Sequence, residues 1–278
     1  MALPVAIQLF TVNRDLSEDF DGTLRRLKEM GYDGVEFADF CGFSPEGLKA
    51  KCEEIGLVPV AYHMGVISMM NMGGAKVAVD TFHRAGFKYI VIPMLQMDRY
   101  PGAEKWEESR DFIIELANEA SVYGMKVCYH NHELEFVNFY EGKYIFDTIF
   151  EMIPGEYLNT EIDTCWARIG GVDPAEYIRK YAGRTPVVHV KDFYITEPRP
   201  EVYSTLFNYE DEEMKKLREE KFEFRPAGHG LLDMPEVIKA SVESGAEWLI
   251  VEQDRPSAGM TPMECAEKSV KFIKACQQ

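Results

Sequence analysis

Imidazole and carboxylate side chains stand at the ends of four short apolar segments of this 278-residue chain. A buried strand has no reason to end in titratable groups unless these groups are paired or used. We therefore expect chemistry at these ends, either proton transfer or metal binding. The four segments end in Tyr129-His130-Asn131-His132, Glu161-Ile162-Asp163, His189-Val190-Lys191-Asp192 and Glu252-Gln253-Asp254.

The spacing of two residues within each end decides which side chains meet. Strand side chains alternate between faces, so His130 and His132 point the same way, as do Glu161 and Asp163. If the apolar residues between them face outward, adjoining strands deliver His, Asp, His and Glu to one small volume. Such a mixed set suits Mn²⁺, Zn²⁺, Co²⁺ or Fe²⁺ better than Ca²⁺, which prefers oxygen ligands alone. A cation would also offset the repulsion among the acids.

Eight apolar segments separated by amphipathic ones are the elements that must position these groups. Strands alternating with helices are typical of a parallel sheet with crossover helices, and about 250 residues make one α/β barrel. We predict an α/β fold, a (β/α)8 TIM barrel that forms a single domain over residues 1–278. The predicted strands are Val5–Phe10, Gly34–Phe37, Val58–His63, Tyr89–Pro93, Val127–His132, Leu158–Asp163, Val187–Val190 and Trp248–Glu252.

Glycines mark the ends of the predicted helices, because glycine supplies the left-handed residue that terminates a helix. Two longer loops, 133–143 and 193–230, are expected on the catalytic face. The charged run 210–220 in the second loop is predicted to be the solvated face of a helix. The predicted helices are Leu24–Met30, Leu48–Ile55, Val77–Ala85, Phe112–Tyr123 and Val237–Ser244.

The amino-acid composition limits the classes of partner that the chain is expected to bind. The chain is 46% hydrophobic and 28% charged, which is ordinary for a globular protein with a core. Its formal net charge is -17 and its pI about 4.8, so nucleic acid would meet a repulsive field. Six scattered cysteines predict reduced thiols, and no leader or long apolar stretch is visible. We expect a cytoplasmic protein without a nucleic-acid or membrane partner.

Four further polar residues have weaker patterns. Glu36 and His63 end predicted strands and either line the pocket or serve the structure alone. His83 lies within a predicted helix and is expected to be structural. His229 is flanked by glycines and is expected to be a turn residue.

The ordered set of strand-end motifs resembles the xylose isomerase-like TIM barrel superfamily of sugar isomerases and epimerases, which also contains inosose dehydratases and endonuclease IV. The string from Tyr129 to Phe136 resembles the "YHNHxxEF" branch, known broadly as sugar phosphate isomerases/epimerases. The resemblance runs over essentially the whole chain. The set is specific for the family and weak for the substrate.

The resemblance implies one divalent metal held by Glu, Asp, His and Glu from strands five to eight. Asp163, His189 and Glu252 match the last three. The chain departs from the pattern at strand five, where His130 occupies the usual register of the glutamate. Either His130 replaces that glutamate, or Glu135 folds back to the metal; we favour Glu135, which preserves three carboxylates and one imidazole.

Trp166 stands where relatives have a second histidine. This removes a second metal ligand and supplies an apolar wall for a sugar ring. A three-metal endonuclease chemistry is therefore not expected.

The resulting hypothesis is a metal-dependent isomerase or epimerase of a sugar or sugar phosphate that works through an enediolate. Mn²⁺ is the metal we expect, with Mg²⁺, Co²⁺, Zn²⁺ and Fe²⁺ as alternatives. The first alternative is a lyase or dehydratase that acts on a keto-inositol or a 3-oxo-sugar. The second alternative is a non-catalytic sugar-binding barrel. The chain could form a homo-oligomer under any of these hypotheses. We assign His132, Lys191 and His130 to catalysis, and Glu36, His63, Trp166 and Asp254 to the substrate pocket.

Overall fold

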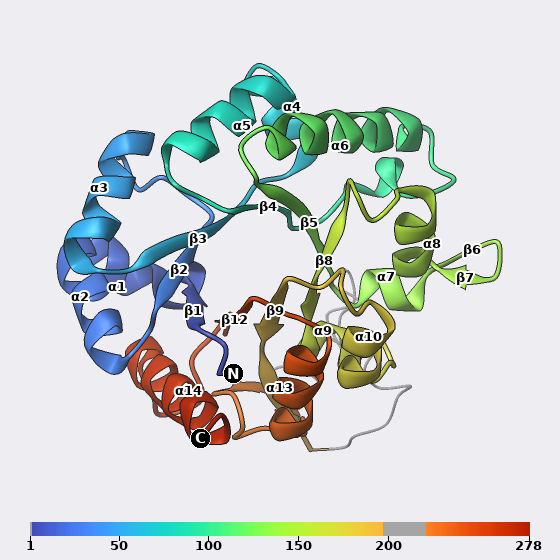
Figure 1. Cartoon of the computed structure of the whole chain (residues 1–278). Coiled ribbons are helices and arrows are strands. Elements are labelled where there is room, and N and C mark those ends of the chain that lie inside the picture. Colours follow the sequence, from blue (N-terminus) through green and yellow to red (C-terminus); the bar gives the residue numbers. More distant parts are fainter. Residues whose placement is uncertain (1, 197–220) are drawn as a thin grey trace.

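Eight short parallel strands close into a barrel at the centre of the computed structural model, which describes residues 2–196 and 221–278 (Figure 1). Around the barrel the strands follow the order β1-β12-β9-β8-β5-β4-β3-β2, so β1 closes the ring by pairing with β12. The predicted TIM barrel is confirmed. Its strands are β1 (Val5–Gln8), β2 (Gly34–Phe37), β3 (Val58–His63), β4 (Tyr89–Ile92), β5 (Lys126–His130), β8 (Asn159–Asp163), β9 (Val187–Val190) and β12 (Trp248–Val251).

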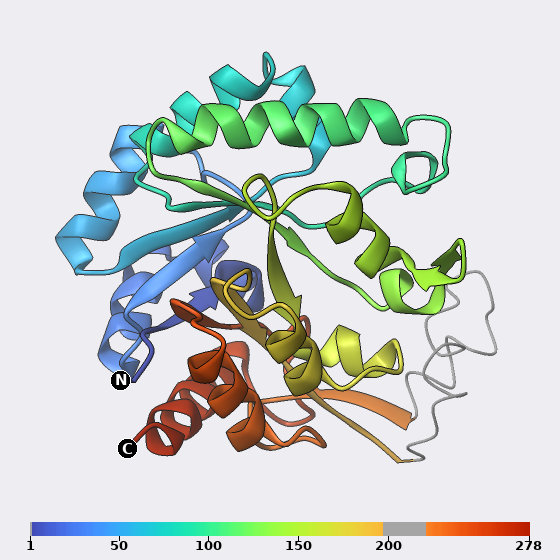
Figure 2. The ribbon, with the colours of Figure 1, turned by 45° about the vertical axis from the view of Figure 1, so that its right-hand side comes forward.

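Helices cover the outer face of the barrel (Figures 1 and 2). The apolar side chains that point outward from the strands pack with the buried faces of these helices into one large core. The α-helices described are α1 (Asn13–Glu18), α2 (Phe20–Met30), α3 (Pro45–Ile55), α4 (Val66–Asn71), α5 (Ala75–Arg84), α6 (Trp106–Ser121), α7 (Leu134–Val137), α8 (Ile145–Met152), α9 (Thr164–Ile169), α10 (Pro174–Lys180), α13 (Met234–Glu243) and α14 (Pro262–Cys276).

A smaller apolar cluster fills the barrel interior near the amino ends of its strands, where Ala6, Cys128, Val187 and Ile250 come together. Gly34 belongs to this layer for steric reasons, since a Cβ atom there would lie 2.6 Å from Val60 Cγ2 and 2.8 Å from the carbonyl oxygen of Val58. Because strand side chains alternate, the residue two positions beyond this layer also points inward. The polar strand ends therefore form the next layer of the interior, at the carboxyl ends of the strands.

The predicted strand and helix bounds agree with the structure to within a few residues, apart from the helix predicted to begin at Phe112, which begins at Trp106. Strand five ends at His130 and not at the predicted His132. The first strand was expected to reach Phe10, but the chain turns at Leu9 into a 3-10 helix, η1 (Leu9–Val12). Gln8 causes this turn, because its side-chain oxygen accepts a hydrogen bond from the backbone N–H of Phe10 at 3.0 Å.

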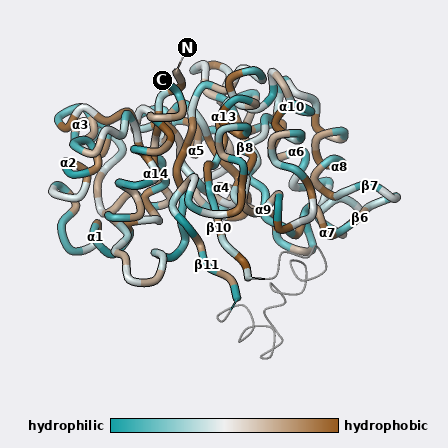
Figure 3. The backbone as a smooth tube through the Cα atoms, turned by 90° about the horizontal axis from the view of Figure 1, so that it is seen from below, coloured by the Kyte–Doolittle hydropathy of each residue, from teal (hydrophilic) through white to brown (hydrophobic). Residues whose placement is uncertain are grey.

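The two long loops carry secondary structure of their own. The loop after β5 contains α7 and a hairpin of β6 (Phe139–Tyr140) and β7 (Lys143–Tyr144). The loop after β9 begins and ends in an antiparallel pair, β10 (Asp192–Ile195) and β11 (Phe222–Arg225). Figure 3 shows this pair at the end of the barrel opposite the chain termini. The charged run 210–220 lies outside the described residues.

Over the described part of the chain, none of the helices combines the length and the apolar character that a membrane span requires.

Candidate active site

Four adjoining strands bring one polar group each to a common point at the carboxyl end of the barrel. His130, Asp163, His189 and Glu252 each offer a nitrogen or oxygen atom that lies within 4.8 Å of the others. His189 Nδ1 lies 3.3 Å from Glu252 Oε2, and His130 Nε2 lies 3.9 Å from Asp163 Oδ2. We call these four residues the upper set. Three of them are ligands predicted from the sequence, and the fourth is the strand-five alternative.

Asp163 is the residue of the upper set that most needs a further partner. Its Oδ1 accepts a hydrogen bond from the backbone N–H of Trp166 at 2.8 Å. Its Oδ2 is buried and has no hydrogen-bond partner among the described residues. Burial raises the pKa of Asp163 to about 7, because a carboxylate removed from water loses its hydration.

Polar side chains hold the carboxyl ends of the strands together where the backbone ladder ends. Asn131 accepts a hydrogen bond from the backbone N–H of Asp163 at 2.9 Å and donates one to its carbonyl oxygen at 3.3 Å. The Thr164 hydroxyl donates to the carbonyl oxygen of Lys191 at 2.8 Å. Asn131, between His130 and His132, and Thr164, directly after Asp163, thus connect neighbouring strands beside the chemical groups.

A second layer of polar groups lies deeper in the barrel and shares residues with the upper set. Glu161 Oε1 lies 2.8 Å from His63 Nε2, 3.0 Å from His189 Nε2 and 3.1 Å from His130 Nδ1. Glu36 Oε1 lies 2.7 Å from His189 Nε2 and accepts a hydrogen bond from Gln8 at 2.9 Å. Glu161 was expected to face the barrel axis but had been given no role.

The two ring nitrogens of His130 and His189 therefore face different partners. One nitrogen of each ring points to the upper set, and the other points to Glu161. A carboxylate that accepts the second N–H of a metal-binding histidine fixes the tautomer and the orientation of the ring. Burial lowers the pKa of His130 to about 4, which leaves the neutral imidazole that a metal requires. Burial would also lower the pKa of His189, but Glu161 and Glu36 raise it well above its ordinary value.

Lys191 supplies the positive charge beside the upper set. Its Nζ lies 2.7 Å from Asp254 Oδ1, 3.0 Å from Glu252 Oε2 and 3.8 Å from Asp163 Oδ2. Burial alone would lower the pKa of Lys191, but the three carboxylates raise it well above its ordinary value. The ammonium group is therefore charged, as the predicted electrostatic role requires.

Aromatic and imidazole rings border this charge. Lys191 Nζ lies 4.8 Å from the ring centroid of Trp166 and 5.3 Å from that of Phe224 on β11. The ring of His132 lies 5.6 Å from Trp166 and 5.0 Å from His130, centroid to centroid. Burial lowers the pKa of His132 well below its ordinary value, so its imidazole is neutral and able to accept a proton. Its Nδ1 is buried without a hydrogen-bond partner in the described part of the chain.

The structure does not bring Glu135 to the upper set, which corrects the preference for it as the strand-five ligand. Glu135 Oε1 accepts hydrogen bonds from the hydroxyls of Tyr129 at 2.6 Å and Tyr100 at 2.7 Å. Its Oε2 accepts one from the backbone N–H of His132 at 2.9 Å. Glu135 thus anchors the start of the loop that carries His132, and His130 takes the strand-five position beside Asp163. No sequence pattern pointed to Tyr100, which lies 35 positions before Glu135.

The other histidines lie apart from the site. The ring of His83, on α5, stacks on Tyr123 with 4.1 Å between centroids. His229 lies in a turn, and its ring approaches Phe272 at 6.0 Å.

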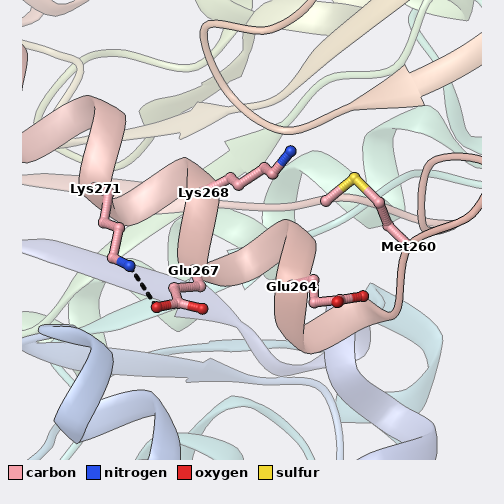
Figure 4. A pocket seen from close by; sticks show the side chains of 5 residues that line it. All are labelled: Met260, Glu264, Glu267, Lys268 and Lys271. Atoms are coloured by element: carbon pink, nitrogen blue, oxygen red, sulfur yellow. Dashed lines mark hydrogen bonds and ion pairs between the residues drawn. The ribbon is translucent and has the colours of Figure 1, made fainter.

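A surface hollow on helix α14 is separate from the barrel interior. Met260 and four charged residues line it, and Lys271 forms an ion pair with Glu267 one helical turn away (Figure 4). It contains none of the strand-end residues. We interpret it as the solvated face of an amphipathic helix. The four charged residues are Glu264, Glu267, Lys268 and Lys271.

The upper set fits a divalent metal ion. Two carboxylates and two imidazoles are ligands that Mn²⁺, Zn²⁺ and Fe²⁺ accept. Asp163 Oδ2, which has no hydrogen-bond partner in the described part of the chain, is the atom that an ion would satisfy. Glu161 supplies the outer partner that oriented imidazole ligands need.

Comparison with known proteins places this geometry in context. The family model of the xylose isomerase-like TIM barrel matches residues 24–276. An inosose dehydratase of Geobacillus kaustophilus (strain HTA426) is 25% identical over 284 residues, which are 91% of this chain and 86% of that protein.

Two solved structures share the fold. A sugar phosphate isomerase/epimerase from Parabacteroides distasonis is 20% identical, with a TM-score of 0.72 over 98% of this chain and 93% of its own. A structure described as IOLI protein with a binding zinc atom is 18% identical, with a TM-score of 0.68 over 99% of this chain and 98% of its own.

Proposed function

This chain belongs to the xylose isomerase-like TIM barrel family, and we propose that it is a metal-dependent enzyme that isomerises or epimerises a sugar or polyol by proton transfer. The observation that carries the proposal is the upper set, in which four strands meet around the buried Asp163 Oδ2, an atom without a hydrogen-bond partner among the described residues. A sugar-binding barrel without catalysis would have no use for such a concentration of titratable groups.

His130, Asp163, His189 and Glu252 are the residues that would hold the ion, with Mn²⁺ as the metal we expect. A divalent ion supplies a Lewis acid that favours the negative oxygen formed when a neighbouring carbon loses its proton. The zinc atom in the IOLI structure supports a divalent ion in a barrel of this fold.

Residues of the chain itself transfer the proton, stabilise the negative oxygen and bind the substrate. His132, neutral at pH 7, accepts the proton from the substrate carbon and returns it to a different carbon or face. The Lys191 ammonium stabilises the enediolate oxygen. The ring of Trp166 packs against the C–H face of the sugar, and Asp254 remains the candidate for contacts to its hydroxyls. Glu36 and His63, which were predicted to line the substrate pocket, lie in the deeper polar layer.

Substitution of His132 tests the proposal. We expect His132→Ala to lower turnover about 10²–10⁴-fold, the usual contribution of a general acid or base, while metal content stays normal. His83→Ala, on the outer helix α5, is the matched control and should retain full activity. Normal turnover in His132→Ala would remove this residue from the mechanism.

A lyase or dehydratase is the second candidate, favoured by the similarity to an inosose dehydratase. The same proton removal can be followed by loss of a β-substituent instead of reprotonation. Incubation of the metal-loaded protein in deuterated water with a ketose, a 3-oxo-glucoside and an inosose separates the two. Deuterium uptake without any other mass change identifies an isomerase or epimerase, whereas loss of water or of the aglycone identifies a lyase. Neither exchange nor product with any of the three would favour a binding protein.

A further inference from the structure

The deeper polar layer contains a closed ring of four contacts among Glu36, His63, Glu161 and His189, which we call the deep set. The distances from His63 Nε2 are 3.0 Å to Glu36 Oε1 and 2.8 Å to Glu161 Oε1. The corresponding distances from His189 Nε2 are 2.7 Å and 3.0 Å. Two nitrogens and two oxygens therefore alternate around one central point.

Hydrogen bonding accounts for this ring only in part. Each Nε2 carries at most one hydrogen, so two hydrogens serve four short contacts. The donors also converge on a single oxygen of each carboxylate, although a carboxylate offers two oxygens to donors. Glu36 Oε2 and Glu161 Oε2 are buried and have no hydrogen-bond partner within the described ranges.

A cation at the centre would contact all four atoms at once. Zn²⁺ takes four nitrogen or oxygen ligands in a tetrahedron at about 2.0–2.1 Å, which places neighbouring ligand atoms about 3.3 Å apart. The four contacts, at 2.7–3.0 Å, would each have to lengthen by only about 0.3–0.6 Å to reach this separation. The two carboxylate charges would balance the charge of the ion.

The geometry points to a second divalent-metal site, distinct from the upper set, in which Glu36 Oε1, His63 Nε2, Glu161 Oε1 and His189 Nε2 bind one ion of the Zn²⁺ type. The ion replaces the hydrogens on the two Nε2 atoms, and two protons leave as it enters. His189 Nδ1 faces Glu252, so when both sites are filled the ring bridges them as an imidazolate and must release its Nδ1 hydrogen as well as its Nε2 hydrogen. The inference does not depend on which reaction the upper set performs.

Metal stoichiometry in matched variants tests the inference. The protein is freed of metal with a chelator, incubated with Zn²⁺, desalted and analysed by mass spectrometry for zinc per chain. We expect two ions in the wild type and one in His63→Asn or Glu36→Gln, since neither residue is itself a member of the upper set. Asp163→Asn should also retain one ion, and the double variant Asp163→Asn/His63→Asn none. Glu247→Gln, which changes a carboxylate bonded to Tyr89 and Lys126 outside both sets, should retain two.

The outcomes separate this inference from the proposed function. One ion that is kept in His63→Asn and lost in Asp163→Asn would overturn the deep site and leave the upper one in place. One ion with the opposite dependence would support the deep site and contradict the upper one. Two ions that survive both His63→Asn and Glu36→Gln would also overturn the inference.

Anomalous diffraction at the zinc edge from crystals of the wild-type protein provides a test that needs no variant to fold. We expect a peak between the four atoms of the deep set. Zinc-soaked crystals without that peak would overturn the inference.

Discussion

Neighbouring residues of one motif have different contacts at this site. In His189-Val190-Lys191-Asp192, His189 faces both polar layers, whereas the Lys191 ammonium stands against three carboxylates. Asp192 has a purely structural task, because its carboxylate accepts backbone hydrogen bonds. Residues two positions apart on a strand share a face. The contacts of each residue therefore depend on which face its position puts it on, as well as on its type.

Replacement of Lys191 by methionine tests its electrostatic role. We expect Lys191→Met to lower kcat about 10²–10³-fold, because a positive charge directed at a developing oxyanion contributes mainly in the transition state. The apparent KM should change much less, and metal content should be kept or increased. The steady-state rate and the metal content of each preparation are the measurements. Lys268→Met, on the exposed face of α14, serves as control, and an equal loss in both variants would contradict a specific role.

The identities of the site residues could be predicted from the sequence more readily than the residues they contact. Asp163, His189 and Glu252 were recognisable because each ends an apolar strand. The choice between His130 and Glu135 was not recognisable, because it depends on where Tyr100 and Tyr129 lie when the chain has folded. A hydrogen bond between residues far apart in sequence leaves no local pattern.

The elements that follow the strands set the shape of the pocket, and the antiparallel pair β10–β11 is the clearest case. Asp192 begins β10 and fixes the turn 228–232 that returns the chain to the barrel. Its Oδ2 accepts the N–H of Gly228 at 3.0 Å and of Gly230 at 2.9 Å, and its Oδ1 accepts the N–H of Leu232 at 3.2 Å. The backbone approaches so closely that a Cβ at Gly230 would lie 2.2 Å from Asp192 Oδ1.

Loss of the Asp192 carboxylate should destabilise this connection. We expect Asp192→Ala to lower the free energy of unfolding by about 2–4 kcal/mol, since one buried and three partly buried N–H groups lose their acceptor. Asp192→Asn, which keeps one acceptor oxygen, should cost less. Urea unfolding followed by circular dichroism measures both. Equal stability of Asp192→Ala and the wild type would show that water or other groups replace the carboxylate.

Helix α14 closes the chain and depends on its first turn. Thr261 accepts a hydrogen bond from the N–H of Glu264 at 3.2 Å, and the Glu264 carboxylate accepts the N–H of Thr261 at 2.7 Å, which together form a capping box. We expect Thr261→Ala to lower the free energy of unfolding by about 1 kcal/mol, and Thr261→Ser to restore most of it. The same unfolding experiment provides the measurement. A Thr261→Ser variant as unstable as Thr261→Ala would contradict the capping role.

The strands were predicted better than the loops for a physical reason. Continuous apolar runs between glycines mark buried parallel strands, and all eight appear near their predicted places. The hairpin β6–β7 and strand β11 obey no such rule, because none of their residues is fully buried, whereas β10 is buried at three of its four residues. The antiparallel pairing of Phe193 with Phe224 joins segments on either side of a long insertion, which local periodicity does not encode.

At the scale of the whole molecule, closure of the barrel creates the site. Glu36 and His189 lie 153 positions apart and meet only because β2 and β9 are strands of the same closed barrel. The apolar interior layer beneath them excludes water from their carboxylates and imidazoles. Folding therefore gathers several carboxylates, which repel one another, in a chain whose net charge is already -17.

Metal binding should offset the repulsion among these carboxylates and so stabilise the whole fold. An ion that binds only the folded state at a free concentration 100 times its Kd adds about 2.7 kcal/mol. For a chain of this size each kcal/mol raises the Tm by about 2–4 °C, so we expect Mn²⁺ to raise the Tm of chelator-treated protein by roughly 5–10 °C. Differential scanning calorimetry with and without Mn²⁺ measures the shift. Asp163→Asn, which removes a carboxylate of the upper set and preserves its volume, should show a much smaller shift. An identical shift in the variant would place the stabilising ion outside the upper set, and no shift in the wild type would contradict a metal-binding barrel.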